Sequence, residues 1–320
     1  METNKCRVAV VIVTYNRCSM LLKTLEYLLC QSFSPLFVVL IDNCSTDDTM
    51  SSLVRCGYIP NTEITPLEKY SSKKANSNNE KVEIIYQRQP VNIGGSGGFH
   101  EGLKLAVSLP VEWVWIMDDD AFPEKSALLK LVEHTGDNGV VALSSVVKNK
   151  KGEIDIVHRK RIEGKLSRFV PVGMKEYYKE TFDYDIFSYV GTLLKKDCIK
   201  EIGLPYKKFF IFYDDTEHSL RVNKRGIIRN INSSIINHQV VYNRSNRMKS
   251  SWKTYYQYRN MLIVRRLHFS PVIWLYDYFV TFSKFLTSLL LFKISYSKQL
   301  IKAMIDSLNV KKHIDINKFG

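Results

Sequence analysis

The stretch Trp113–Asp120, with the sequence WVWIMDDD, places three consecutive carboxylates directly after an apolar and aromatic run. Such a run is typical of a buried β-strand. Three adjacent carboxylates repel one another and are costly to dehydrate, and a bound divalent cation removes that cost. Oxygen ligands of this kind suit Mg²⁺ or Mn²⁺. The alternative is a solvated acidic turn in which an Asp caps a helix that begins near Pro123.

Two strand–helix units precede this stretch. Residues 7–14, RVAVVIVT, form a β-branched run typical of a buried parallel strand, and residues 19–31 have the helical spacing of Leu and Met. Residues 36–41 predict a second strand, and the capping residues from Ser45 onward predict a helix that ends near Arg55. Successive strand–helix units imply a mainly parallel sheet that binds its ligand at the carboxyl ends of the strands.

A glycine-rich segment follows a third predicted strand at residues 82–86. Residues 92–99, NIGGSGGF, place four glycines ahead of a helix predicted to end near Ser108. Glycines allow close backbone approach, and the free N–H groups of a helix start favour a phosphate. The segment is neither a Walker A loop nor a GxGxxG motif after the first strand, and a tight turn is the simpler alternative. The polar residues 57–81 lack periodicity and predict a surface loop.

A second acidic segment begins at residue 214. The aromatic residues 209–213, FFIFY, predict a strand-like segment that runs into Asp214, Asp215 and Glu217 at the start of a helix. A capping cluster alone would explain these acids, but the repeat of an aromatic segment followed by carboxylates favours a functional site. Residues 227–236 predict a further strand that ends at His238, a position where a lone His is more often hydrogen-bonded than a metal ligand.

The composition favours an anionic partner and a reducing environment. The net charge is +14, which fits nucleic acid, an anionic membrane or a phosphorylated ligand. Basic residues are not interleaved with a nucleic-acid-binding motif, so nucleic acid is not expected as a partner. The six cysteines contain no CxxC pair, and the N-terminus has no apolar region typical of a signal peptide.

The C-terminal part of the chain is aromatic, basic and predicted to be helical. Residues 252–268 predict one helix, and residues 271–292 are apolar enough to span a bilayer except that Asp277 and Lys284 interrupt them. An amphipathic helix in the membrane interface is the favoured interpretation, because cationic flanks attract anionic lipid. A helix packed on the core or on a partner subunit is the alternative, which leaves a homo-oligomer open. The tail from residue 295 predicts a short amphipathic helix.

Four motifs in register resemble family 2 glycosyltransferases of the GT-A fold. They are VVIVTYNR at 10–17, IDNCSTD at 41–47, NIGG at 92–95 and MDDD at 117–120. The NIGGSGGF and YDDTEHSLR segments are most similar to bacterial galactofuranosyltransferases and to a related rhamnosyltransferase-like group. The resemblance implies an α/β fold with a Rossmann-like, mixed but mainly parallel sheet flanked by helices, followed by a C-terminal helical extension.

The same resemblance implies roles for individual residues. The residues expected to bind the nucleotide-sugar donor are Thr14, Asn16, Arg17, Asp42, Asn92, Gly94, Gly95, Asp118 and Asp119. The residues expected to bind Mn²⁺ or Mg²⁺ are Asp120, Asp118 and His238. Asp215 aligns with the catalytic base, but members often have Glu-Asp where this chain has Asp214-Asp215, so Asp214 stays a second candidate. Arg244 and Arg247 are candidates for clamping a diphosphate or a lipid phosphate.

The expected organisation is a catalytic domain over residues 1–245 and a basic helical region over 246–320. Within the first, 6–147 would bind the donor and 148–245 would hold the acceptor and the base. The expected activity is metal-dependent inverting transfer of galactofuranose from UDP-galactofuranose to a lipid-linked or polymeric cell-surface glycan. It would take place in the cytoplasm, on the inner face of the membrane. The alternatives are transfer from dTDP-rhamnose and, outside enzymes, a basic nucleic-acid- or membrane-binding protein.

Overall fold

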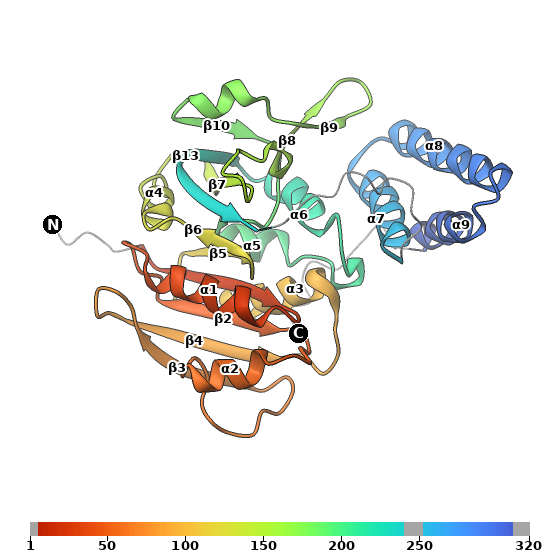
Figure 1. The fold of residues 1–320 in the computed structure, drawn as a ribbon. Coiled ribbons are helices and arrows are strands. Elements are labelled where there is room, and N and C mark those ends of the chain that lie inside the picture. The colour runs from red at the N-terminus through yellow and green to blue at the C-terminus, as the bar shows by residue number, and fades with distance from the viewer. Residues whose placement is uncertain (1–5, 240–251, 310–320) are drawn as a thin grey trace.

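The computed structural model describes residues 6–239 and 252–309, and one large sheet organises it (Figure 1). The strand order is β10-β13-β7-β12-β5-β1-β2-β4-β3, and β6 pairs with β13 outside this path. A smaller sheet has the order β11-β8-β9. The α/β class predicted from the sequence is confirmed, with parallel pairing in β5-β1-β2-β4 and in β7-β13.

The elements follow one another in the order that their numbers give. The strands are β1 (Val8–Thr14), β2 (Phe37–Asp42), β3 (Lys69–Ala75), β4 (Lys81–Arg88), β5 (Trp113–Asp118), β6 (Ala121–Pro123), β7 (Val140–Lys148), β8 (Arg159–Glu163), β9 (Arg168–Pro171), β10 (Thr181–Tyr184), β11 (Ile186–Phe187), β12 (Thr192–Lys195) and β13 (Ile227–His238). The α-helices are α1 (Cys18–Leu29), α2 (Thr49–Arg55), α3 (Gly94–Ala106), α4 (Ala127–Val132), α5 (Lys196–Ile202), α6 (Asp214–Val222), α7 (Trp252–His268), α8 (Pro271–Leu290) and α9 (Ile294–Leu308). Three 3₁₀ turns are η1 (Ile156–His158), η2 (Met174–Tyr178) and η3 (Lys207–Phe209).

The central strand β1 brings three polar strand ends together. It pairs in parallel with β2 on one side and β5 on the other. Thr14 lies opposite Asp42, and its neighbour Val13 lies opposite Asp118. Because the strand order reverses beside β1, this edge is the place where an open α/β sheet binds its ligand.

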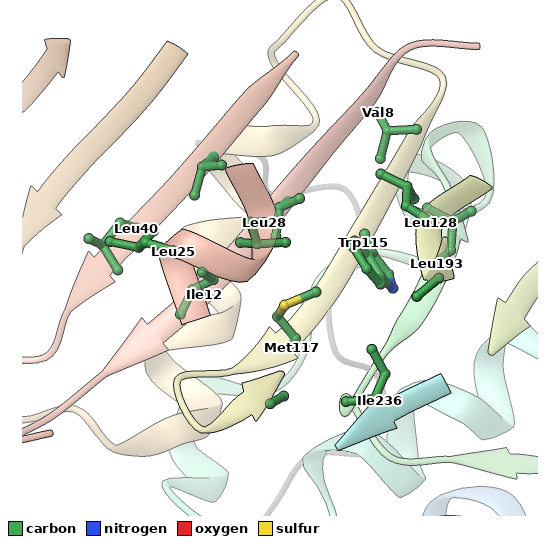
Figure 2. Close-up of a cluster of buried hydrophobic side chains, with 14 of the residues drawn as sticks. Val8, Ile12, Leu25, Leu28, Leu40, Trp115, Met117, Leu128, Leu193 and Ile236 are labelled. Atoms are coloured by element: carbon green, nitrogen blue, oxygen red, sulfur yellow. The ribbon is translucent and has the colours of Figure 1, made fainter. Parts of the chain in front are cut away.

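The β-branched residues of β1 alternate between two buried layers. Val8 and Ile12 face one layer, where Leu25 and Leu28 of α1 and Trp115 of β5 pack against them (Figure 2). The opposite layer holds α3, α5 and α6. This two-sided burial explains why the strand is a continuous apolar run without polar alternation.

Helix α3 approaches the sheet closely because of two glycines. A β-carbon at Gly98 would lie 2.4 Å from Val13, and one at Gly102 would lie 2.4 Å from Val11. The sequence predicted that the four glycines precede the helix. In the structure they lie within its first turns. Its glycines serve helix–sheet packing as well as the ligand edge.

Two further predictions of secondary structure in this half of the chain were wrong. Residues 57–81 are not a loop throughout, because β3 pairs antiparallel with β4 at the sheet edge. Every second residue of β3 is exposed and the others are only half-buried, so the strand has no apolar face to reveal it. The helix expected near Pro123 begins at Ala127, because residues 121–123 pair with the end of β13 instead.

Helices α7, α8 and α9 form a separate group, coloured blue in Figure 1. Arg265 of α7 pairs with Asp277 of α8 at 2.8 Å, and Lys284 of α8 donates to the Tyr258 hydroxyl. The charged residues that interrupt α8 thus face its neighbouring helix. Within the described residues, none of the helices combines the length and the apolar character that crossing a membrane requires.

The predicted domain boundary at residue 245 lies outside the described residues, as do Arg244 and Arg247 with their expected role in phosphate binding. The division into 1–245 and 246–320 therefore stays a prediction. All six cysteines are free thiols in the structure.

Candidate active site

A cavity of about 1170 Å³ opens at the carboxyl edge of the sheet. Both acidic segments singled out in the sequence reach it. We call Asp118–Asp120 the acidic triplet, and Asp214 with Asp215 the acidic pair. Residues of both line the cavity, together with His238, whereas Asp120 lies behind the surface and is 4% exposed.

Three side chains converge on one point beside the triplet. One ligand atom each from Asp118, Asp120 and His238 lies within 4.8 Å of the others. His238 Nε2 lies 3.2 Å from Asp120 Oδ1 and 3.7 Å from Asp118 Oδ2. The antiparallel pairing of β6 with the end of β13 places His238 opposite Ala121 and so brings the imidazole to the triplet.

These three residues fit a divalent cation. Asp120 Oδ1 and His238 Nε2 are buried and face each other, yet neither has a hydrogen bond of acceptable geometry among the described residues. Two carboxylate oxygens and one imidazole nitrogen are a donor set that cations such as Mn²⁺ accept. An ion at this point would give both orphaned atoms a partner.

Burial sets the electrostatics of the triplet. Desolvation raises the pKa of Asp118 to about 6 and that of Asp119 to about 7. Burial acts on Asp120 too, but His238 and Arg17 outweigh it and hold its pKa below the usual value. Although burial opposes it, the same carboxylates raise the pKa of His238. Positive charge is thus required to keep all three acids ionised.

Arg17, at the start of α1, supplies part of that charge. Its Nη1 lies 2.6 Å from Asp120 Oδ2 and 3.3 Å from Asp119 Oδ1. The hydroxyl of Thr14 donates to Asp119 Oδ2 at 2.7 Å, and that of Thr24 donates to the Asp119 carbonyl. The middle carboxylate therefore has protein partners, while the outer two face the candidate metal point.

The acidic pair has a different environment. Desolvation and the neighbouring Asp215 raise the pKa of Asp214 to about 7, and desolvation also raises the pKa of Asp215. Oδ1 of Asp215 accepts hydrogen bonds from the N–H and the hydroxyl of Thr216. Among residues 6–239 and 252–309 no basic side chain forms an ion pair with either acid. Both lie in the first turn of α6, whose dipole favours their negative charge.

A strained loop carries the acidic pair, and it corrects the strand predicted for residues 209–213. Phe210, Phe212 and Tyr213 have φ values of 63°, 67° and 65°, in the left-handed region that non-glycine residues rarely adopt. The side chain of Asn260, fully buried in α7, holds this loop because three carbonyl oxygens share the two N–H groups of its Nδ2. Its acceptors are the carbonyl oxygens of Phe209 (3.0 Å), Ile211 (2.9 Å) and Phe212 (2.9 Å).

Sequence reasoning missed Asn260. Nothing in its local pattern distinguishes it from other polar residues of the predicted helix 252–268. The contact joins α7 to a loop 48 to 51 residues earlier in the chain, so no local pattern marks it.

The other predicted donor-binding residues fall into two groups. Asp42 is fully buried, where it accepts from the Tyr86 hydroxyl and the Ser45 N–H at 2.7 and 2.8 Å. Asn16 is exposed and accepts from the Thr46 N–H. Neither lines the cavity, so both are placed to hold the strand ends. The predicted donor-binding residues that do line it are Thr14, Arg17, Asn92, Gly94, Gly95, Asp118 and Asp119.

The start of α3 joins the two sides of the cavity. A β-carbon at Gly94 would lie 2.1 Å from the Phe210 carbonyl oxygen, so only glycine lets this loop pack here. That carbonyl also accepts from the Ser96 N–H, and the Gly94 N–H donates to Asn92. Part of the helix start is therefore occupied by protein acceptors. A β-carbon at Gly95 would meet no atom within 4 Å.

Comparison with known proteins identifies the family. The profile described as "Glycosyltransferase like family 2" matches residues 6–260. The chain is 22% identical over 224 residues to the galactofuranosyltransferase GlfT1 of Mycolicibacterium smegmatis, covering 69% of this chain and 66% of the relative. It is 24% identical over 218 residues to GlfT1 of Mycobacterium tuberculosis, covering 68% and 64%. The match thus spans slightly less than two thirds of each curated relative.

Solved structures share the fold at low sequence identity. GalNAc-T7, crystallised with UDP, GalNAc and Mn²⁺, superimposes with a TM-score of 0.58 at 15% identity, over 83% of this chain and 48% of that one. TarS residues 1–349 of S. aureus in complex with UDP-GlcNAc gives 0.51 at 17% identity, over 81% and 66%. With the family match over most of its length, the chain belongs to glycosyltransferase family 2 and has the GT-A fold.

Proposed function

We propose that this glycosyltransferase is metal-dependent and inverting, and that it transfers galactofuranose from UDP-galactofuranose to a lipid-linked or polymeric cell-surface glycan. One observation carries the proposal: two acidic clusters on separate elements line one cavity, and only one of them converges with an imidazole. Inverting transfer needs one group to stabilise the leaving diphosphate and another to accept a proton.

In this scheme the acidic pair activates the acceptor. Asp215 takes the proton from an acceptor hydroxyl, whose oxygen attacks the anomeric carbon as the bond to the diphosphate breaks. Asp215 is the better candidate than Asp214 because it is only half-buried, and its Oδ2 has no hydrogen-bond partner among the described residues, whereas Asp214 is 9% exposed. Its raised pKa favours proton transfer near neutral pH.

The triplet would hold the leaving group. Asp118, Asp120 and His238 would bind the cation, which when present neutralises charge that develops on the departing diphosphate. Arg17 reaches the same place and keeps nearly half of its side chain exposed, so it can contact a phosphate while it neutralises Asp120. An imidazole beside two carboxylates favours Mn²⁺ over Mg²⁺, because Mg²⁺ prefers oxygen ligands alone.

The donor is proposed from similarity. The curated relatives are named galactofuranosyltransferases, and the TarS structure contains UDP-GlcNAc. Purified protein should release UDP from UDP-galactofuranose in the presence of Mn²⁺ and lose this activity with EDTA. The comparison donors are dTDP-rhamnose and UDP-glucose, and NMR of the product's anomeric centre reports inversion. Release of nucleotide from dTDP-rhamnose alone would replace the proposed donor, and retention at the anomeric centre would contradict the mechanism.

We also propose that α8 lies on an anionic membrane surface on the cytoplasmic side. Its polarity is reversed relative to that of a core helix: Asp277 pairs inward and Thr281 and Ser288 are buried, while large apolar residues face outward. The exposed large hydrophobic residues of α8 are Val272, Leu275, Tyr276, Phe279, Phe282, Leu286, Leu289 and Leu290. Such an outer face matches an interfacial helix, and the net charge of +14 would favour anionic lipid.

This surface can be tested with vesicles. The protein should sediment with vesicles of equal parts phosphatidylcholine and phosphatidylglycerol but not with phosphatidylcholine alone. Phe279→Asp combined with Leu290→Asp should release it while transfer to a soluble acceptor persists. Concentration-dependent dimerisation, lost in the same double variant without any vesicle binding, would instead assign the face to a second copy of the chain.

A further inference from the structure

Three aromatic rings form a ledge at the mouth of the cavity, and we call Phe210, Trp252 and Tyr256 the aromatic ledge. All three line the cavity that contains the acidic pair. Phe210 stacks on Tyr256 with ring centroids 5.1 Å apart and planes 24° from parallel. Trp252 meets both rings nearly edge-on, at centroid distances of 5.9 Å. The rings therefore form one connected group.

Trp252 is exposed, unlike the other three tryptophans of the chain. It is 55% exposed, whereas Trp113 and Trp115 are 4% and 0% exposed in the sheet core. An indole left in water at a cavity rim forgoes a large gain from burial, which a ligand can recover. Polar side chains accompany it, since Lys253 and Gln257 of the same helix also line the cavity.

The ledge is held rigidly. The guanidinium of Arg259 lies 4.9 Å from the Tyr256 ring centroid and 5.1 Å from that of Tyr255. Gly94 packs against the backbone and the ring of Phe210. Phe210 also belongs to the loop that leads into the acidic pair. A surface whose rings are fixed in advance binds with less loss of side-chain freedom.

We propose that the aromatic ledge binds a sugar ring of the acceptor glycan, by stacking of the ring's apolar C–H face on the exposed indole of Trp252. This inference rests on the proposed function, and it adds the residues that select a saccharide acceptor. The polar rim formed by Lys253 and Gln257 suits the hydroxyls at the edge of such a ring. Phe210 belongs to the loop that runs into Asp214 and Asp215, so a saccharide on the ledge lies beside the group that accepts its proton.

The donor's nucleobase is the competing occupant, since any flat π-face can stack. The ledge belongs to α7 and to the 209–213 loop. Among the residues expected to bind the donor, Gly94 touches Phe210, but Thr14 lies at the end of β1 and Asn92 follows β4, so neither belongs to the helix that carries Trp252 and Tyr256. The saccharide is therefore the occupant that the arrangement favours, and the nucleobase becomes an outcome of the test.

The test compares Trp252→Ala with Trp252→Phe in full-length protein, with UDP-galactofuranose as donor, Mn²⁺, and octyl β-D-galactofuranoside as the acceptor probe. Trp252→Ala should raise the KM for the acceptor about tenfold, the factor expected for one lost aromatic contact. Trp252→Phe should retain most of the affinity. The KM for the donor, and the slow hydrolysis of donor without acceptor, should stay unchanged in both. Tyr178→Ala, which removes an 80% exposed ring outside the cavity lining, is the matched control.

Each other outcome overturns the assignment. A higher KM for the donor with an unchanged KM for the acceptor would show that the ledge binds the nucleobase of the donor. No change in either would show that no substrate touches it. If wild-type protein fails to use UDP-galactofuranose, the donor proposal fails, and the ledge is tested separately by tryptophan fluorescence. Titration with octyl β-D-galactofuranoside, β-D-glucopyranoside and α-L-rhamnopyranoside should change the fluorescence of wild-type protein but not of Trp252→Phe, and no change with any of them would sink the proposal.

Discussion

The acidic triplet and the acidic pair are both short runs of buried carboxylates, but they differ in the positive charge beside them. At the triplet, burial raises the pKa of Asp118 and Asp119, while His238 and Arg17 hold the pKa of Asp120 below its usual value. At the pair, no described basic side chain forms an ion pair, and burial raises the pKa of Asp214 to about 7. The difference lies in the imidazole and the guanidinium beside Asp120. Carboxylates that share such partners suit a cation site, and carboxylates with raised pKa values and no ion pair suit proton exchange.

The largest expected effect is that of Asp215→Asn, which tests the role of the acidic pair. This nearly isosteric change removes the proposed proton acceptor, so kcat should fall about 10³-fold, within the range for loss of a general base. Binding of UDP with Mn²⁺, measured by calorimetry, should stay close to that of wild type. Asp214→Asn is the matched control and should retain far more activity. If Asp214→Asn is the more damaging change, the two roles are exchanged.

Asp120→Ala tests the acidic triplet and should weaken the binding of Mn²⁺. It removes a candidate metal ligand and leaves Arg17 and His238 without their nearer carboxylate. Affinity for Mn²⁺ should weaken at least about 100-fold, since even outer partners of a metal contribute about 10–100-fold. Titration of Mn²⁺ by electron paramagnetic resonance in the presence of UDP measures this directly. Unchanged Mn²⁺ affinity would remove the metal from the triplet.

Asn260→Ala tests whether the acidic pair depends on its loop. Loss of the amide that three carbonyl oxygens share should let the 209–213 loop relax, and kcat should fall roughly 10–100-fold because a displacement near 1 Å can have this effect. The KM for the donor should change little, since the triplet lies on other elements. Asn260→Asp places a carboxylate against three carbonyl oxygens and should be worse. Equal losses in Mn²⁺ binding and in kcat would indicate general unfolding, which circular dichroism would reveal.

A pH profile sharpens the distinction further. Asp215 must be ionised to accept a proton, and burial raises its pKa above the usual Asp value, so its ionisation is lost at a higher pH than that of an exposed Asp. With donor and Mn²⁺ saturating, kcat should therefore fall about tenfold for each pH unit below the pKa of Asp215. The rate should level off above it. A rate independent of pH between 5 and 8, measured at about the same donor saturation throughout, would contradict a titrating base.

The smallest expected effect concerns stability. Because the pKa of Asp214 rises on folding, the folded state loses stability as the pH increases from the ordinary Asp value to about 7. Asp214→Asn removes that dependence and should raise the melting temperature at pH 8 by about 2–4 °C for each kcal/mol recovered. The gain should disappear near pH 4. A variant that is destabilised at both values would show that the carboxylate is needed for packing.

The sequence predicted the donor side of the fold well. Strands β1, β2 and β5 are buried on both faces, so they are continuous apolar runs whose ends are marked by polar residues. The triplet could be found because its charges interrupt such a run abruptly. The resemblance to a family located His238, while local pattern alone favoured an ordinary hydrogen-bonded histidine.

Features that depend on distant contacts could not be predicted. Strand β3 is paired on only one side, and its half-buried residues are mostly polar like its exposed ones. No alternation of polar and apolar residues therefore marks it. Residues 121–123 form a strand only because β13 lies beside them. The left-handed conformations of the 209–213 loop are stabilised by Asn260, which acts from a helix far along the chain. Such a contact leaves no short-range signal.

The clamp by Asn260 has a consequence for how the protein loses activity on heating. Three residues in left-handed conformations each store about 1–3 kcal/mol, and hydrogen bonds from one amide hold them there. A helix at the periphery opens at lower free energy than a central sheet. When α7 detaches, the loop can relax and move the acidic pair while β1 and β5 remain folded. Thermal inactivation should then precede the melting of the sheet, so that catalysis reports on the docking of one peripheral helix.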